Sequence, residues 1–337
     1  MNTIPTIFNQ PVTPYTAVGG KERSASTGIT AVILNRKGQY QHRSFFQELD
    51  KSGFDNIVSI ESSSPHYDIE ELSGRFPNVR FVLPEREINL GEQINLAAAE
   101  VESPLFLVLR NDMKIIAGGT AERMAERLTL HEETDENENK PDGFKRLCTV
   151  PVLINSCYEP LPTLASPVIK KRKMRTVLMD PRVNGQCCLY PFDGIGIYDR
   201  SRFIQTGGFD ISINNKYWQL MDFGFRSYLW GEEIALSLQL KFSCEGETSS
   251  EDYTVEESYS RFYLKNLAPV FRGDYANLPF SRFISFIFKS GEDIFSSWND
   301  YTQIKKWVKT NKFRWKHDAR AVTGLWGNTQ TTGESSS

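Results

Sequence analysis

Residues 105 to 116 read Leu-Phe-Leu-Val-Leu-Arg-Asn-Asp-Met-Lys-Ile-Ile and are the most informative stretch of the sequence. A short apolar run ends abruptly in the polar triplet Arg110, Asn111 and Asp112. Such a run is typical of a buried strand in an α/β sheet. Side chains just beyond the carboxyl ends of these strands line the crevice where ligands bind. The sequence therefore predicts a ligand site beside Asp112.

Three further apolar segments precede this strand and alternate with helical patterns. They predict strands over residues 29–34, 56–60 and 79–83, with helices over 41–51 and 69–75. Strands and helices that alternate at this spacing predict a parallel sheet with helical crossovers. The first third of the chain is therefore expected to be a nucleotide-binding half.

The remaining pattern is mixed and then helical. It predicts helices over 117–130 and 218–229, strands over 148–155, 194–198 and 234–242, and a solvated acidic loop near 132–142. Apolar residues at helical spacing predict a helical C-terminal extension over 266–323. The proline and glycine residues of segment 1–28 predict a flexible arm. The high Gly, Thr and Ser content of segment 324–337 predicts a disordered tail.

Composition limits the function classes. The 337 residues are 39% apolar, enough for a sizeable core, and the net charge of -3 gives no global field that would favour nucleic acid. The five cysteines are odd in number and lack C-x-x-C spacing, so reduced thiols are expected. Neither a signal peptide nor a spanning apolar stretch is evident, which predicts a cytoplasmic protein.

Four sequence blocks occur in a suggestive order. They are residues 89–95 (Asn-Leu-Gly-Glu-Gln-Ile-Asn), the triplet 110–112, residues 207–210 (Gly-Gly-Phe-Asp) and residues 218–226 (Trp-Gln-Leu-Met-Asp-Phe-Gly-Phe-Arg). In this order they resemble the N-x-G helix start, the D-x-D motif, and the G-G-F-D and E-D-x-D segments of the family 2 glycosyltransferases. The resemblance spans about residues 29 to 265.

The resemblance implies a GT-A type α/β fold, a Rossmann-like mixed sheet flanked by helices. Residues 29–116 would form the nucleotide-binding half and residues 117–265 the acceptor half. The implied reaction is inverting transfer of a sugar from a nucleotide-diphosphate sugar to a hydroxyl acceptor, as in polysaccharide biosynthesis. The acceptor would be a glycan, a polysaccharide or a lipid-linked group.

Asp112 is the candidate metal ligand. Mg2+ or Mn2+ prefers oxygen ligands and is often held by one or two carboxylates plus substrate phosphates. The alternative is that Asp112 caps the following helix or closes a turn. Arg110 stands at the first acidic position of the motif, where a guanidinium cannot bind a metal but can pair with a phosphate. Its alternative is an ion pair with Glu100 or Glu102.

For the nucleotide, the resemblance points to Asn35 and Glu61, which follow the first and second predicted strands. The alternative for Glu61 is an exposed carboxylate in a Ser-rich turn. Asn89, Gly91 and Asn95 lie at a helix entry, where backbone N–H groups favour a polar ligand. Asn89 is also a good N-cap, and Gly91 suits a close approach of backbone.

Asp222 is the candidate general base, because the usual base position of the family holds Leu220 beside Gln219. The alternative is a helix carboxylate paired with Arg226 four residues on. Asp210 and Trp218 are candidates for contact with the acceptor or donor sugar. Cys244 stands where a histidine often completes the metal site of this family.

The altered motif positions leave rival functions open. One rival is a catalytically degenerate GT-A protein that acts as a nucleotide-binding or scaffold subunit. Another is a nucleotidyltransferase, which usually has a Gly-rich loop with Arg and Lys directly after the first strand. Residues 35–38 (Asn-Arg-Lys-Gly) resemble such a loop weakly. The basic segment 305–320 and the preceding Phe and Ile residues either pack as a core face or contact the inner face of a membrane.

Overall fold

The structure is a computed structural model that describes most of the chain. The described residues are 13–20, 27–35, 42–62, 68–117, 120–134, 144–170, 173–244, 252–254, 257–284 and 294–326. The acidic run and the C-terminal tail therefore lie largely or wholly outside the described residues.

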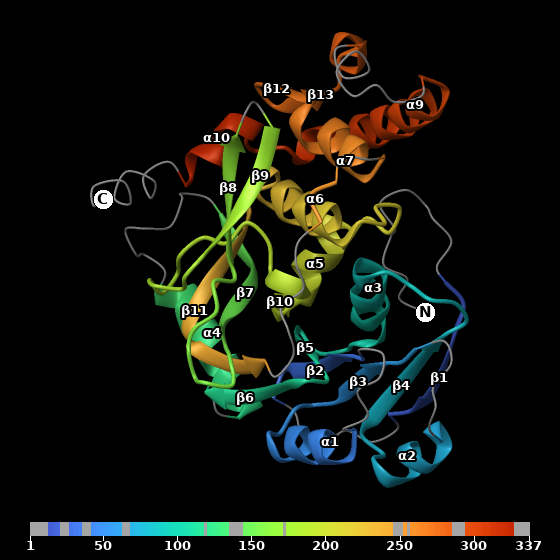
Figure 1. Cartoon of the computed structure of the whole chain (residues 1–337), viewed down its shortest axis with the longest axis vertical. Coiled ribbons are helices and arrows are strands. Elements are labelled where there is room, and N and C mark those ends of the chain that lie inside the picture. Colours follow the sequence, from blue (N-terminus) through green and yellow to red (C-terminus); the bar gives the residue numbers. More distant parts are fainter. Residues whose placement is uncertain are drawn as a thin grey trace.

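A nine-stranded mixed sheet forms the centre of the molecule, in the order β1-β4-β3-β2-β5-β10-β7-β11-β6 (Figure 1). Its strands are β1 (Tyr15–Gly19), β2 (Ile29–Leu34), β3 (Ile57–Ile60), β4 (Val79–Pro84), β5 (Leu105–Arg110), β6 (Met113–Ala117), β7 (Lys145–Ile154), β10 (Gly196–Asp199) and β11 (Glu232–Cys244). Strands β4, β3, β2 and β5 run parallel, as do β7 and β11, whereas β1, β10 and β6 are antiparallel to their neighbours.

Helices cover both faces of this sheet (Figure 1). They are α1 (His42–Lys51), α2 (Ile69–Arg75), α3 (Leu90–Glu100), α4 (Ala121–Thr134), α5 (Arg200–Thr206) and α6 (Lys216–Leu229). Alternate residues of β2 separate the two cores: Ala31 and Ile33 pack on the side of α1 and α2, and Val32 and Leu34 on the side of α3 and α6. The expected mixed sheet flanked by helices is confirmed.

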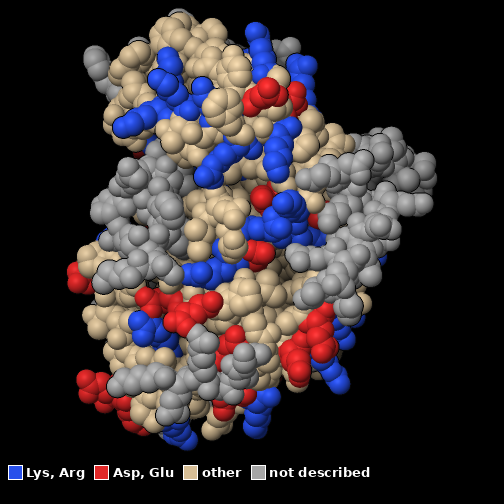
Figure 2. Space-filling model, turned by 180° about the vertical axis from the view of Figure 1, so that it is seen from behind, with Lys and Arg blue, Asp and Glu red and all other residues tan. Residues whose placement is uncertain are grey.

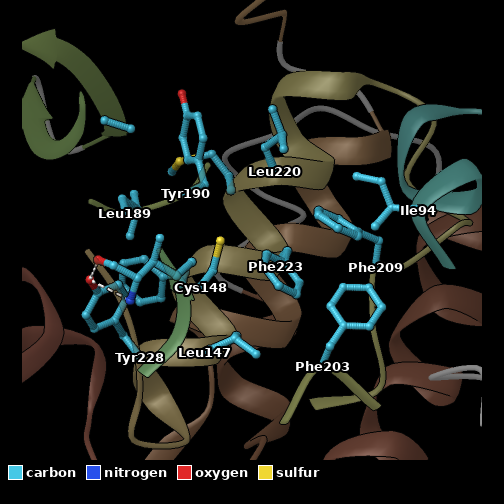
Figure 3. Close-up of a cluster of buried hydrophobic side chains, with 14 of the residues drawn as sticks. Ile94, Leu147, Cys148, Leu189, Tyr190, Phe203, Phe209, Leu220, Phe223 and Tyr228 are labelled. Atoms are coloured by element: carbon cyan, nitrogen blue, oxygen red, sulfur yellow. Dashed lines mark hydrogen bonds between the residues drawn. The ribbon is translucent and has the colours of Figure 1, made fainter. Parts of the chain in front are cut away.

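Aromatic packing fixes α6 against the sheet (Figure 3). Phe209 stacks on Phe223 of α6 with ring centroids 4.2 Å apart, and Phe203 contacts both rings. A Cβ on Gly224 would lie 1.9 Å from the carbonyl oxygen of Leu189, so α6 approaches that backbone as closely as only glycine permits. This packing fixes the part of α6 around Phe223 and Gly224.

The C-terminal region is helical, as expected, and includes one hairpin. It comprises α7 (Glu257–Phe262), a π-helical turn (Tyr263–Leu267), β12 (Val270–Arg272), β13 (Tyr275–Asn277), α9 (Ile294–Asn311), a 3-10 turn (Lys312–Arg314) and α10 (Ala319–Gly324). Helix α9 buries Tyr301, Ile304 and Trp307, and Trp307 stacks on Trp230 beyond α6. These three buried residues thus form a core face of α9.

Several expectations about the elements are wrong. Tyr15–Gly19 of the expected flexible arm is a strand that pairs with β4. The helix expected from residue 117 begins at Ala121, because Met113–Ala117 pairs with β11 as β6. The hairpin of β8 (Leu164–Lys170) and β9 (Lys173–Met179) was not expected, and Lys170 pairs with Lys173 across it. Local composition did not reveal these long-range pairings.

Two further findings concern the whole described chain. All five cysteines are free thiols, and burial raises the pKa of Cys188 to about 12. Within the described residues, none of the helices combines the length and the apolarity needed to cross a bilayer.

Candidate functional site

The candidate site lies at the carboxyl edge of the sheet, between β2 and β5. From β2 the chain adds β3 and β4 on one side, then crosses to add β5 on the other. This reversal is a topological switch point, the place where open α/β sheets bind ligands. Asn35, Glu61 and Arg110 end or follow strands at this edge.

Asn35, Ser59 and Glu61 form one hydrogen-bonded group, which we call the Asn35 network. The Asn35 amide nitrogen donates to Ser59 Oγ and the Ile60 carbonyl, both at 3.0 Å, and Ser59 Oγ donates to Glu61 at 2.6 Å. Glu61 is only 4% exposed, so the alternative of an exposed turn carboxylate is wrong. Among the described residues, Asn35 Oδ1 is a buried acceptor without a hydrogen-bond partner. Residues 36–38, which belong to the loop that resembles nucleotidyltransferases, lie outside the described residues.

A second group, which we call the edge cluster, comprises Arg110, Asp112, Asp193, Lys216 and Cys244. Arg110 Nε and Nη2 donate to the two oxygens of Asp112, each at 2.9 Å, and Nη1 donates to Asp193 at 2.6 Å. Nη2 also lies 2.7 Å from Cys244 Sγ. Lys216 Nζ donates to the second oxygen of Asp193 at 2.7 Å.

The fold brings these distant residues together. Only Asn111 and Asp112 separate β5 from β6, and β6 pairs Met113 with Cys244 at the end of β11. Cys244 is therefore held next to Arg110. Asp193 lies in a turn before β10 with φ of 50°, a left-handed conformation that Asp tolerates better than most residues. Its two oxygens point to different basic groups.

The described residues do not fit the metal that the resemblance implies. Both carboxylate oxygens of Asp112 accept from Arg110, and the Asp112 side chain is 2% exposed. Within the described residues, no three His, Cys, Asp or Glu side chains are grouped so as to hold a metal ion. Burial alone would lower the pKa of Arg110, but the hydrogen bonds and charge of Asp112 outweigh it and raise that pKa.

The partners of Arg110 differ from those expected. They are Asp112 and Asp193, whereas Glu100 pairs with Arg80 and Tyr15. Asp193 and Lys216 were not identified from the sequence. The Asp-Gly pair at 193–194 signals a turn, but no local pattern places it beside a residue more than 80 positions earlier.

A third group, which we call the interior cluster, contains Asp210, Asp222, Arg226, Arg261, Lys265 and Asn266. Asp222 is fully buried and accepts from Lys265 at 2.7 Å, from Asn266 at 2.8 Å and from Arg226 at 3.4 Å. This geometry favours the structural alternative for Asp222, pairing with Arg226, over the role of general base.

Asp210 belongs to the same cluster rather than to an open surface. Its carboxylate lies 2.9 Å from Lys265 and is 1% exposed. Burial raises the pKa of this carboxyl, but the charges of Lys265 and Arg261 outweigh burial and lower it to about 2. Trp218 is also buried, with Nε1 donating to the Thr254 carbonyl at 2.8 Å and its ring stacked on Phe262.

The residues at the start of α3 brace the loop that carries Asp210. Asn89 Oδ1 caps α3, which confirms its N-cap role, and Asn95 holds Phe209 through both backbone groups at 2.9 Å. A Cβ on Gly91 would lie 2.5 Å from Phe209, which confirms the expected close approach. Gln219 connects the start of α3 with the loop that carries Asp210. Its side chain accepts from the backbone N–H of Gly91 and donates to Asn89 and to the Asp210 carbonyl.

The chain was compared with known proteins. No family model matches it, and no curated protein matches it. Among solved structures it is similar to GalNAc-T7 with UDP, GalNAc and Mn2+, at 12% identity and a TM-score of 0.47, over 84% of this chain and 57% of that one.

Two further similar structures are of S. aureus TarS. One has 10% identity and a TM-score of 0.42 over 84% of this chain and 43% of that one. The other, TarS 1-349 in complex with UDP-GlcNAc, has 12% identity and a TM-score of 0.41 over 90% and 92%. This chain thus spans about half the length of GalNAc-T7 and of the longer TarS chain.

Proposed function

We propose that this chain is a glycosyltransferase that binds a nucleotide-diphosphate sugar at the carboxyl edge of β2, β3 and β5. The observation that carries the proposal is the Asn35 network at the switch point, next to the edge cluster. A buried carboxylate and an amide acceptor suit the N–H of a nucleobase and the hydroxyls of a ribose. The order of the family 2 blocks supports the same reading.

The roles of the residues follow from their positions. Glu61 and Asn35 would accept hydrogen bonds from the base or ribose. Arg110 and Lys216 would face the diphosphate, where fixed positive groups stabilise the charge that develops on the leaving group. The acceptor oxygen would then bond to the anomeric carbon as the bond from that carbon to the diphosphate breaks, with inversion; the nucleoside diphosphate leaves and the hydroxyl proton passes to water. Asn89, Gly91 and Asn95 support the site by fixing α3 against the loop at Asp210.

A second candidate function is nucleotide binding without transfer. It is favoured by the absence of a carboxylate at the usual base position, where Leu220 packs in the core at 3% exposure. The buried contacts of Asp222 point the same way. Such a protein would bind a nucleotide and act as a scaffold or regulatory subunit.

The test is calorimetric titration with UDP, GDP, CDP and ADP, followed by assays of nucleotide release from UDP- and GDP-sugars with acceptor extracts. We expect Glu61→Gln to weaken binding by about tenfold or more, equivalent to about 1.4 kcal/mol. The matched control is Glu233→Gln, a carboxylate that is 1% exposed and pairs with Arg146 at the opposite edge of the sheet.

The outcomes of these assays separate the candidates. Binding with nucleotide release supports transfer, and binding without release supports the second candidate. Failure of every nucleotide to bind would overturn both functions. An equal loss of affinity in Glu61→Gln and Glu233→Gln would contradict the position of the nucleotide.

We also infer peripheral contact between the C-terminal region and an anionic lipid surface. Lys and Arg side chains gather on the upper part of the molecule, where this region lies (Figures 1 and 2). Exposed apolar rings accompany them, with Trp298 at 48% and Phe313 at 69%. Anionic vesicles should sediment a larger fraction of the protein than neutral vesicles do. The Phe313→Ser variant should show a smaller difference between the two vesicle types. Equal sedimentation with both vesicle types would refute the contact.

A further inference from the structure

The guanidinium of Arg110 occupies the centre of the edge cluster. Its four hydrogen bonds reach Asp112 twice, Asp193 once and Cys244 once. These partners come from three segments of the chain: the turn after β5, the turn before β10 and the end of β11. The group that holds these segments together is therefore a cation supplied by the protein itself.

Within the described residues, this cluster pairs two carboxylates with two cations. The carboxylates of Asp112 and Asp193 face the cations of Arg110 and Lys216. The side chains of Arg110, Asp112 and Asp193 are 5%, 2% and 6% exposed. A divalent ion placed between the two carboxylates would displace the guanidinium's hydrogen bonds and lie beside a fixed positive charge with little water to screen it.

Arg110 and Lys216 are also arranged to meet an anion. Among the described residues, the four bonds of Arg110 leave one of its five N–H groups, on Nη1, for a further acceptor. Lys216 stands at the N-terminus of α6 with 37% of its side chain exposed. Both groups contact Asp193, so this carboxylate sets the spacing between the two cations.

We propose that Arg110 is the resident cation of this site and that, with Lys216, it donates hydrogen bonds to the donor diphosphate in place of a divalent metal. The inference rests on the proposed function for the identity of the anion. It assigns Arg110 to diphosphate binding, and it assigns Asp112 and Asp193 to positioning the two cations.

The first test uses the wild-type protein without nucleotide. Free Mn2+ gives an electron paramagnetic resonance signal that is lost on binding, so the signal should be the same with and without the protein. Tight binding of Mn2+ by the wild type would overturn the inference, whatever nucleotides do.

The second test is titration of UDP and GDP in EDTA and again in excess MnCl2. The affinities should agree within about twofold, whereas a gain of about tenfold or more with Mn2+ would overturn the inference. If neither nucleotide binds in either buffer, the proposed function and the diphosphate role both fail. The first test still decides whether the cluster takes a metal.

Variants of Arg110 separate its charge from its geometry. Arg110→Asp removes the cation and adds a carboxylate beside Asp112 and Asp193, so this variant should acquire Mn2+ binding by the same resonance assay. Arg110→Lys keeps the charge but cannot pair with two acceptors in one plane. It should therefore remain metal-independent and lose about tenfold in nucleotide affinity.

The matched control is Arg146→Lys, which changes the ion pair with Glu233 at the opposite edge of the sheet. Its affinity for nucleotide and its lack of response to Mn2+ should equal those of the wild type. Full nucleotide affinity in Arg110→Lys would overturn the role of the guanidinium. Because Arg110→Lys retains the positive charge, this variant keeps the test available if Arg110→Asp does not fold.

Discussion

The edge cluster and the interior cluster contain the same kinds of groups in different surroundings. Each joins two carboxylates to basic side chains. In the interior cluster Asp222, Lys265 and Arg226 have no exposed surface, and Asp222 pairs with both of the buried basic groups. In the edge cluster Lys216 is partly exposed at the ligand edge of the sheet. The interior cluster therefore stabilises the fold, whereas the edge cluster is the one for which we propose ligand binding.

The interior cluster also explains why a carboxylate in a catalytic motif position can be structural. Lys265 and Arg261 come from the segment after the sheet, and Arg261 pairs with Asp300 of α9 at 2.5 Å. Asp222 thus connects α6 with the C-terminal region. Buried ion pairs of this kind are costly to break because one charge remains without its partner.

The largest expected effect breaks the interior cluster. Asp222→Ala leaves Lys265 and Arg226 buried without this carboxylate and should lower the free energy of unfolding by about 3–5 kcal/mol. Chemical denaturation measures this value. The exposed Glu48→Ala variant is the control and should change the value by less than about 0.5 kcal/mol. A stable Asp222→Ala protein that has lost only turnover would instead support a general base.

The second prediction restores an acidic residue beside the usual base position. Gln219→Glu removes two amide donations, to Asn89 and to the Asp210 carbonyl, and should cost about 2–3 kcal/mol near neutral pH. Burial should raise the pKa of the new carboxyl, so the loss should shrink as the pH falls toward about 4 and the group becomes a donor again. If denaturation curves give the same loss of unfolding free energy at every pH, ionisation of the new carboxyl is not its cause.

The third prediction uses the pKa of Asp210, which is lowered to about 2 in the folded protein. A lowered carboxyl pKa contributes stability above the unfolded value and loses it as the pH falls through the folded value. The difference in unfolding free energy between wild type and Asp210→Asn should therefore narrow by about 2 kcal/mol between pH ~4 and pH ~2. Denaturation at several pH values measures it, and a constant difference would show that the charge of Asp210 adds nothing.

The smallest effect on stability is expected in the edge cluster. Lys216→Ala removes a partly exposed cation and should change the free energy of unfolding by less than about 1 kcal/mol. Its affinity for UDP should nevertheless fall by about tenfold. Lys305→Ala, on the exposed side of α9, is the control and should alter neither quantity. A large loss of stability in Lys216→Ala would erase the contrast between the two clusters.

The sequence predicted the strands and helices whose signals are local. Residues 29–34 and 69–75 were predicted with the bounds observed for β2 and α2, and Asn89 was identified as an N-cap. The sequence did not predict pairings between distant segments. Strand β6 owes its conformation to β11, and the contacts of Arg110 with Asp193 and Cys244 span 83 and 134 positions. No spacing rule identifies partners at such separations.

The short connection between β5 and β6 has a consequence for synthesis of the chain. β6 ends at Ala117 but pairs with β11, which begins at Glu232. At roughly 5–20 residues per second, a ribosome would leave β6 as a bare strand edge for on the order of ten seconds. Exposed edges recruit other strands. The nascent chain should therefore be most prone to misassembly in this interval, and the edge cluster, which includes Cys244 of β11, can form only after β11 has left the exit tunnel.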